Sequence, residues 1–191
     1  MNAYQERFVN EVVKCRQNMI YIELSREMLE KIDEFVRQVI VKKSKEEHHR
    51  YDNTSEYKRF FTGVMGECAI EQAFGCKFID WSIGDSSYYH RADLKSLGIQ
   101  VGIKTVEMFK FPIVFKTERY PELICIKRNE NTIILCGLAQ VDVLNRYQDD
   151  NLILDWKLRN RGTKTGFYGF EHLIKVSSLE ELKLLAPITQ Y

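Results

Sequence analysis

Residues 91–105 of this chain, with the sequence RADLKSLGIQVGIKT, decide the fold that we expect for the rest. They predict a short strand at 92–94, a turn, and a second strand over 99–107, which together form a hairpin. Side chains alternate along a strand, so the apolar residues of the second strand share one face and a polar set shares the other: Gln100, Gly102 and Lys104. Pairing across the hairpin is expected to place Asp93 opposite Gln100. An acid and a lysine would then lie on one polar surface.

The composition limits the class of protein. Of the 191 residues, 45% are hydrophobic and 12% are aromatic, which suits one substantial core and argues against a disordered chain. The formal net charge is only +1, so binding of nucleic acid has to rest on local basic patches. Five cysteines without a CxxC pair predict reduced thiols and no structural zinc site. No stretch is long and apolar enough for a membrane span, and we expect a cytoplasmic protein without a membrane partner.

Hydrophobic periodicity predicts the remaining elements. Helices are expected over residues 4–16, 25–40 and 55–74, the last ending at Gly75. Further strands are expected over 19–24, 77–81, 113–115, 123–127, 132–138 and 152–156, with short helices over 140–147 and after Ser177 or Ser178. This order indicates an α/β or α+β protein with a mixed central sheet flanked by helices. Residues 1–50 are expected to form an N-terminal helical extension, and residues 51–191 one core domain.

The helix expected over residues 55–74 contains a carboxylate in an otherwise apolar stretch. Glu67 follows Gly63 and Gly66, and small residues allow a helix to approach a sheet closely. A carboxylate there is costly to bury without a cation or a hydrogen-bond donor. Glu67 could then point toward the sheet that the helix approaches.

Three features in this order resemble the PD-(D/E)XK nuclease superfamily: the helix with Glu67, Asp93 at the hairpin, and the strand that ends in Lys104 and Thr105. The resemblance covers residues 55–138 and implies a restriction-endonuclease-like core. It also implies a metal-dependent DNA endonuclease of restriction type or phage type, with Mg²⁺ as cofactor and Mn²⁺ as a substitute. DNA is then the expected partner, and a homodimer would let two sites address two strands. RNA stays open as a substrate.

The resemblance gives roles to individual residues. Asp93 and Glu67 would hold the metal together with the main-chain carbonyl of Ile103, and Lys104 would assist the attacking water. These residue types suit the chemistry, because hard divalent cations prefer oxygen ligands and lower the pKa of a bound water. A lysine beside that water offsets negative charge in the transition state.

The sequence departs from the motif at Gly102, where the family has an acid two positions before the lysine. Glu67 or Glu71, one helical turn apart, could supply that carboxylate, and Gln100 could supply a neutral oxygen on the same strand face. Glu107 falls on the opposite face and is the weaker candidate. The departure also favours an alternative function, a catalytically degenerate nuclease fold that binds nucleic acid or protein. A plain interaction protein without a nucleic-acid role is the third interpretation.

Two further features bear on nucleic-acid binding. His90 lies three residues before Asp93 and could approach a substrate phosphate, although a loop histidine without a function is the simpler interpretation. Four cations without an acid between them predict a phosphate-contact patch or an ordinary solvated loop: Lys157, Arg159, Arg161 and Lys164.

Overall fold

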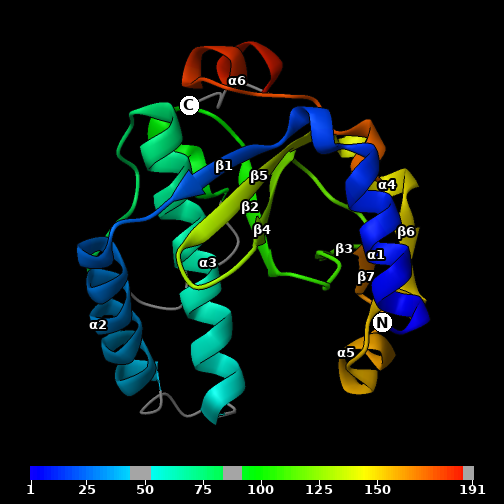
Figure 1. Ribbon diagram of the computed structural model, residues 1–191, viewed down its shortest axis with the longest axis horizontal. Helices are drawn as coiled ribbons and strands as arrows, with labels where there is room; N and C mark the ends of the chain where they lie inside the picture. Colours follow the sequence, from blue (N-terminus) through cyan, green and yellow to red (C-terminus); the bar gives the residue numbers. More distant parts are fainter. Residues whose placement is uncertain (44–52, 84–91, 187–191) are drawn as a thin grey trace.

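A four-stranded mixed sheet in the order β1-β5-β4-β2 forms the centre of the protein (Figure 1). The computed structural model describes residues 1–43, 53–83 and 92–186. β1 (Ile20–Glu23) pairs antiparallel with β5 (Thr132–Ala139), and β5 pairs antiparallel with β4 (Glu122–Lys127). β2 (Gly102–Glu107) runs parallel to β4 and ends the sheet order. The expectation of a mixed sheet is confirmed.

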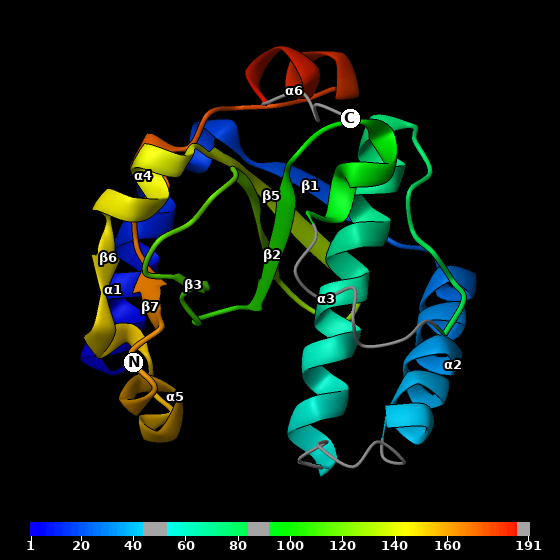
Figure 2. The same cartoon turned by 180° about the vertical axis from the view of Figure 1, so that it is seen from behind.

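α3 (Asn53–Phe74) packs on one face of this sheet, and α2 (Arg26–Lys43) lies beside α3 on its outer side, as both views show (Figures 1 and 2). α3 packs against β2 at Gly66, where an added Cβ would overlap the hydroxyl of Thr105 and lie 2.8 Å from its Cβ. The predicted close approach of this helix to the sheet is therefore confirmed. The helix ends as predicted, because Gly75 adopts a left-handed φ of 62° directly after it.

The other face of the sheet packs against a second sheet and α1 (Ala3–Lys14). The second sheet is antiparallel, in the order β3-β7-β6. Its strands are short, and their bounds are β3 (Ile113–Phe115), β7 (Lys164–Phe167) and β6 (Gln148–Asp149). Phe8 of α1 is fully buried between the rings of Phe111 and Phe170. Two hydrophobic cores thus enclose the central sheet, one on each face.

Short helices complete the described chain. α4 (Val141–Arg146) follows β5, and α5 (Trp156–Asn160) precedes β7. α6 (Leu179–Leu185) begins after Ser178, whose side chain accepts a hydrogen bond from the Glu181 N–H, as predicted for this cap. The 3₁₀ turns are η1 (Arg16–Asn18), η3 (Asp93–Leu97), η4 (Asp150–Leu152) and η5 (Phe170–His172).

The segment that we expected as an N-terminal helical extension takes part in both cores. β1 is a strand of the central sheet, and the side chains of Ile22, Ile32 and Phe8 are almost completely buried. The predicted boundary between residues 50 and 51 lies outside the described residues. Removal of the segment would expose both cores to water.

Three expected strands are absent from the described chain. Residue 92 precedes η3, and residues 93 and 94 belong to it, so no strand forms here. The 3₁₀ helix ends at Gly98, which adopts a left-handed φ of 79°. Residues 77–81 pair with no strand, since the Phe78 and Ile79 N–H groups donate to Glu71 instead. Residues 152–156 contain the end of η4 and the start of α5, where the Asp155 side chain caps the helix.

The second strand of the predicted hairpin begins later than expected, at Gly102 instead of Ile99. The alternation of its faces is confirmed, because Ile103 and Thr105 lie toward α3 and Val106 lies toward the second core. Among the helices that the structure describes, none is long and apolar enough to cross a membrane.

Candidate functional site

Asp93 lies against the outer edge of β2. The Leu94 N–H donates a 3.0 Å hydrogen bond to the Val101 carbonyl, which folds η3 back onto the strand. The Ile103 N–H then donates to Asp93 Oδ2 at 2.5 Å, so the pairing differs from the predicted position opposite Gln100. The N–H and C=O of one residue point to the same side of a strand, and the Ile103 carbonyl therefore faces this edge as well.

The carboxyl of Asp93 is in an unfavourable environment for charge. The residue is exposed to solvent, yet many protein atoms lie around its carboxyl, and the desolvation that they cause raises its pKa. The hydrogen bond from Ile103 and the charge of Lys104 oppose that effect. A cation at this edge would stabilise the charged form further.

The Lys104 side chain extends from the face of β2 opposite to Ile103 and Thr105. It lies near a carboxylate that the motif did not predict. Its Nζ lies 3.5 Å from Oε1 of Glu122, the first residue of β4. Burial would lower the pKa of Lys104, but the charges of Glu122, Glu118 and Asp93 outweigh it and raise that pKa. Lys104 is thus a permanent cation at neutral pH and cannot act as a general base.

Glu122 stands beside Gly102 in the parallel register of β2 and β4. An added Cβ on Gly102 would overlap Oε2 of Glu122 and would lie 2.7 Å from its Cδ. The carboxylate therefore fills the space of a side chain at position 102. Its Oε2 atom is buried and has no hydrogen-bond partner in the described part of the chain. Burial raises the pKa of Glu122 to about 8, against the opposing charge of Lys104.

Glu67, on α3, lies near Asp93 as the sequence predicted. Burial raises the pKa of its carboxyl to about 8, and the negative charges of Asp93 and Glu71 add to the effect. Glu71, one turn later, instead holds the chain that follows the helix, because its oxygens accept hydrogen bonds from the Phe78 and Ile79 N–H groups at 2.6 and 2.9 Å. Burial would raise the pKa of Glu71, but these bonds and the Lys77 ammonium at 3.0 Å lower it.

The donor set suits a hard cation. Asp93, Glu67 and Glu122 offer carboxylate oxygens, and Oε2 of Glu122 has no hydrogen-bond partner in the described part of the chain. In residues 1–43, 53–83 and 92–186, no three acidic, histidine or cysteine side chains are gathered as a ready metal cage. Mg²⁺ commonly binds through one or two carboxylates and keeps several waters, so a cage of three is not required. The residues present therefore fit the cation that the motif implies.

The other predicted site residues are distributed differently. Gln100 is partly exposed and precedes β2, and His90 lies outside the described residues. Of the four predicted DNA-binding cations, Arg159 donates to the Ile153 carbonyl at 2.6 Å, and the ammonium of Lys157 lies 5.9 Å from the Trp156 ring. Arg161 is exposed beside them. These three residues lie in or beside α5.

Lys164 separates from this group, because it lies on β7 and close enough to Lys104 to feel its charge. Burial lowers its pKa, and the charges of Lys104 and Arg59 lower it further. The ammonium stands 5.0 Å from the centre of the Phe115 ring. A second cation is thereby placed near the acidic cluster.

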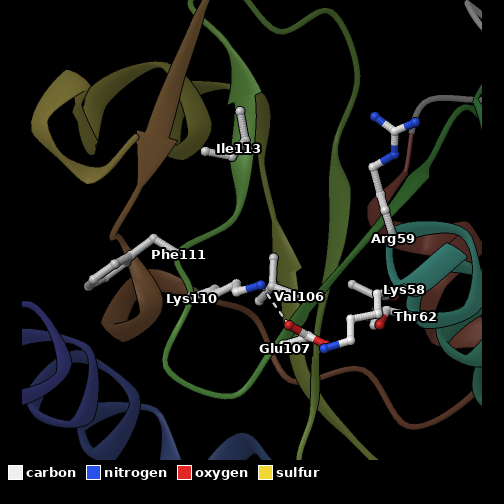
Figure 3. A pocket seen from close by; sticks show the side chains of 9 residues that line it. Lys58, Arg59, Thr62, Val106, Glu107, Lys110, Phe111 and Ile113 are labelled. Atoms are coloured by element: carbon white, nitrogen blue, oxygen red, sulfur yellow. Dashed lines mark hydrogen bonds and ion pairs between the residues drawn. The ribbon is translucent and has the colours of Figure 1, made fainter. Parts of the chain in front are cut away.

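A pocket of about 530 Å³ opens between α3 and the C-terminal half of β2 (Figure 3). Lys58 and Arg59 project from α3 on one side, and Lys110 approaches from the other, where it forms a 2.6 Å ion pair with Glu107. The remaining lining residues are mixed in character: Thr62, Thr105, Val106, Phe111 and Ile113. The charged residues of its lining are mainly basic, and the pocket lies on the strand that carries Lys104.

Sequence reasoning missed Glu122 because the predicted strand began one residue later, at Leu123. The signal was present, since Glu122 is a charge placed directly before four consecutive apolar residues in ELICIK. What the sequence could not supply was the parallel register that sets Glu122 beside Gly102.

Comparison of the chain with models of known protein families, with curated proteins and with solved structures finds no match.

Proposed function

We propose that this protein is a metal-dependent nuclease that hydrolyses phosphodiester bonds in DNA, with a core of the PD-(D/E)XK type. One observation carries the proposal: Asp93 accepts a hydrogen bond from the Ile103 N–H, Lys104 follows Ile103 on β2, and the carboxylate of Glu122 lies in the space of a side chain at position 102. The mixed sheet, with α3 packed against its terminal strand, supports the proposed core.

Each residue of the site has a role in this proposal. Asp93, Glu67 and the Ile103 carbonyl would hold Mg²⁺, or Mn²⁺ in its place. Such a cation, when bound, polarises the scissile phosphate and lowers the pKa of an attacking water. Lys104 donates hydrogen bonds from a permanently charged ammonium, which orients that water and offsets the negative charge of the transition state.

A polyanionic substrate such as nucleic acid is favoured by the cations around this site. Lys58 and Arg59 line the pocket beside β2, and Lys164 approaches Lys104 from the second sheet. A polyanion bound along this path would pass the carboxylates with cations on both sides. Contacts of this kind release counterions, so binding should weaken steeply with salt.

The test is cleavage of linear, single-stranded and closed circular DNA with Mg²⁺, with Mn²⁺ and with a chelator. We expect cleavage only with metal, and nicking or linearisation of the circle would show an endonuclease. Asp93→Ala, purified in parallel, controls for contaminating nuclease and should be inactive. Cleavage that survives chelation, or that the variant retains, would refute the proposal.

A second function, binding without catalysis, is favoured by Gly102 and by the lack of three gathered metal-ligating side chains among the described residues. A degenerate nuclease fold would bind DNA with a clear salt dependence but would not cleave any substrate in the panel. Absence of both cleavage and salt-dependent binding would leave a protein-interaction role as the remaining interpretation.

A further inference from the structure

Glu122 is the most deeply buried acid near the site. Its side chain is 1% exposed, whereas that of its ion-pair partner Lys104 is 32% exposed. One oxygen faces the lysine, and the other has no hydrogen-bond donor in the part of the chain that the structure describes. Leaving a buried polar group without a hydrogen-bond partner is costly, and more so for a charged one. The unpaired Oε2 atom indicates that Glu122 has a role beyond its ion pair with Lys104.

The position of Glu122 suggests that role. Gly102 and Lys104 share one face of β2, and Glu122 stands next to Gly102 across the parallel pair. The three atoms nearest to a Cβ on Gly102 are Oε2, Cδ and Oε1 of Glu122. The carboxylate thus comes from β4 into the place that an acid on β2 would occupy.

We propose that Glu122 is a metal ligand that replaces, from the neighbouring strand, the carboxylate missing at Gly102. The inference rests on the proposed function, and it adds a ligand to Asp93. The charged groups around Glu122 are Lys104, Asp93 and Glu118, and Lys164 lies close enough to Lys104 and Glu118 to interact with both. A divalent cation would give Oε2 its missing partner and would favour the charged form of the carboxylate.

The competing explanation is that Glu122 only anchors Lys104. A purely structural role predicts that loss of the Glu122 charge changes stability and leaves metal affinity unaltered. A ligand role predicts loss of metal affinity, and it also predicts that an acid returned to position 102 restores binding. Gly102 lies outside the left-handed φ region, and the three atoms nearest to an added Cβ all belong to Glu122, so removal of that side chain would make room for an acid there.

The experiment is calorimetric titration of Mn²⁺ into the full-length, metal-free protein. The variants are Glu122→Gln, Asp93→Asn, Gly102→Asp, and Gly102→Asp combined with Glu122→Ala. We expect Glu122→Gln and Asp93→Asn to weaken Mn²⁺ binding by at least about tenfold. Gly102→Asp alone should perturb folding by overlap with Glu122, whereas the double variant should regain most of the wild-type affinity.

The outcomes separate the two proposals. Mn²⁺ affinity lost in Asp93→Asn but unchanged in Glu122→Gln would overturn this inference and leave the proposed function intact. Absence of Mn²⁺ binding by the wild type would overturn both. Circular dichroism melting shows whether each variant folds; if Glu122→Gln does not, the double variant decides, and its failure to bind Mn²⁺ while folded would overturn the inference.

Discussion

The carboxylate of Glu122 occupies the space beside Gly102 that any side chain at position 102 would fill. The proposed motif therefore lacks an acid when it is read along the chain, while the proposed site contains one in space. The acid is held by the parallel pairing of β2 with β4 and by the ammonium of Lys104 at 3.5 Å. This relationship leads to predictions about catalysis, pH and stability.

Replacement of Lys104 by methionine should reduce the single-turnover cleavage rate by about 10²–10³-fold, the usual effect of removing one charged donor from a transition state. The affinity for DNA should change by less than about tenfold, because one contact among many is lost. Rates measured at saturating enzyme separate the two effects. Lys175→Met, at an exposed lysine after the second sheet, is the matched control. Equal rates for Lys104→Met and the control would contradict the assigned role.

The stability of the metal-free protein should fall as pH rises from about 4.5 to 8. The pKa of Glu122 in the folded protein is about 8, above the ordinary carboxyl value of 4.5. Between these two pH values the folded state holds a proton on Glu122 that the unfolded state has released. The stabilisation that this proton gives to the folded state is therefore complete below pH 4.5 and is lost by about pH 8. The size is on the order of a few kcal/mol. Denaturant unfolding of the wild type and Glu122→Gln measures it, and curves that stay parallel across this window would argue against the shift.

Metal affinity should change in the opposite direction with pH. A cation must displace the protons that Glu67 and Glu122 hold below about pH 8, so Mn²⁺ should bind more tightly as pH rises from about 6 to 9. Calorimetry in two buffers with different ionisation enthalpies would count the protons released. Binding without proton release at about pH 7 would contradict the assigned carboxylates.

The basic pocket should contribute to DNA affinity without contributing to chemistry. Lys58→Ala combined with Arg59→Ala should weaken DNA binding uniformly across sequences and lower the slope of log affinity against log salt by about 1–2. Lys183→Ala, on exposed α6 at the far end of α3, is the control (Figure 1). Fluorescence anisotropy at several salt concentrations measures both quantities. An unchanged slope in the double variant would remove the pocket from the DNA path.

Two glycines of α3 should respond oppositely to alanine. Gly66→Ala would place a Cβ inside the Thr105 side chain and should destabilise the fold by about 1–3 kcal/mol. Gly63 has no atom within 4 Å of an added Cβ, so Gly63→Ala should stabilise the helix by about 0.5–1 kcal/mol. Urea unfolding of both variants tests the packing of α3 on β2. Similar effects of the two substitutions would contradict it.

Local signals made much of the fold predictable. The end of α3 at Gly75, the alternation along β2 and the cap at Ser178 depend on neighbouring residues, and all three were confirmed. The expected strand at 77–81 was wrong for a reason at longer range: Glu71 takes the N–H groups that a neighbouring strand would otherwise pair.

The candidate site was predictable only in part. Asp93 lies near both Glu67 and Lys104, as the order of the three along the chain suggested. Glu122 was not foreseen, because its position depends on the register between two strands that are separated in sequence by β3 and the loops around it. The role of β1 was likewise hidden, since its partner β5 follows far later in the chain.

The most direct test of a nuclease centred on Asp93 separates binding from chemistry. Protein is bound to DNA without metal, Mn²⁺ is added, and cleavage is followed over a single turnover for the wild type and Asp93→Asn. We predict that bound wild type converts its DNA to product, while the variant binds an equal fraction and leaves it intact. Bound wild type that fails to cleave after the addition of Mn²⁺, or cleavage at the same rate by Asp93→Asn, would contradict a metal-dependent nuclease with Asp93 at its centre.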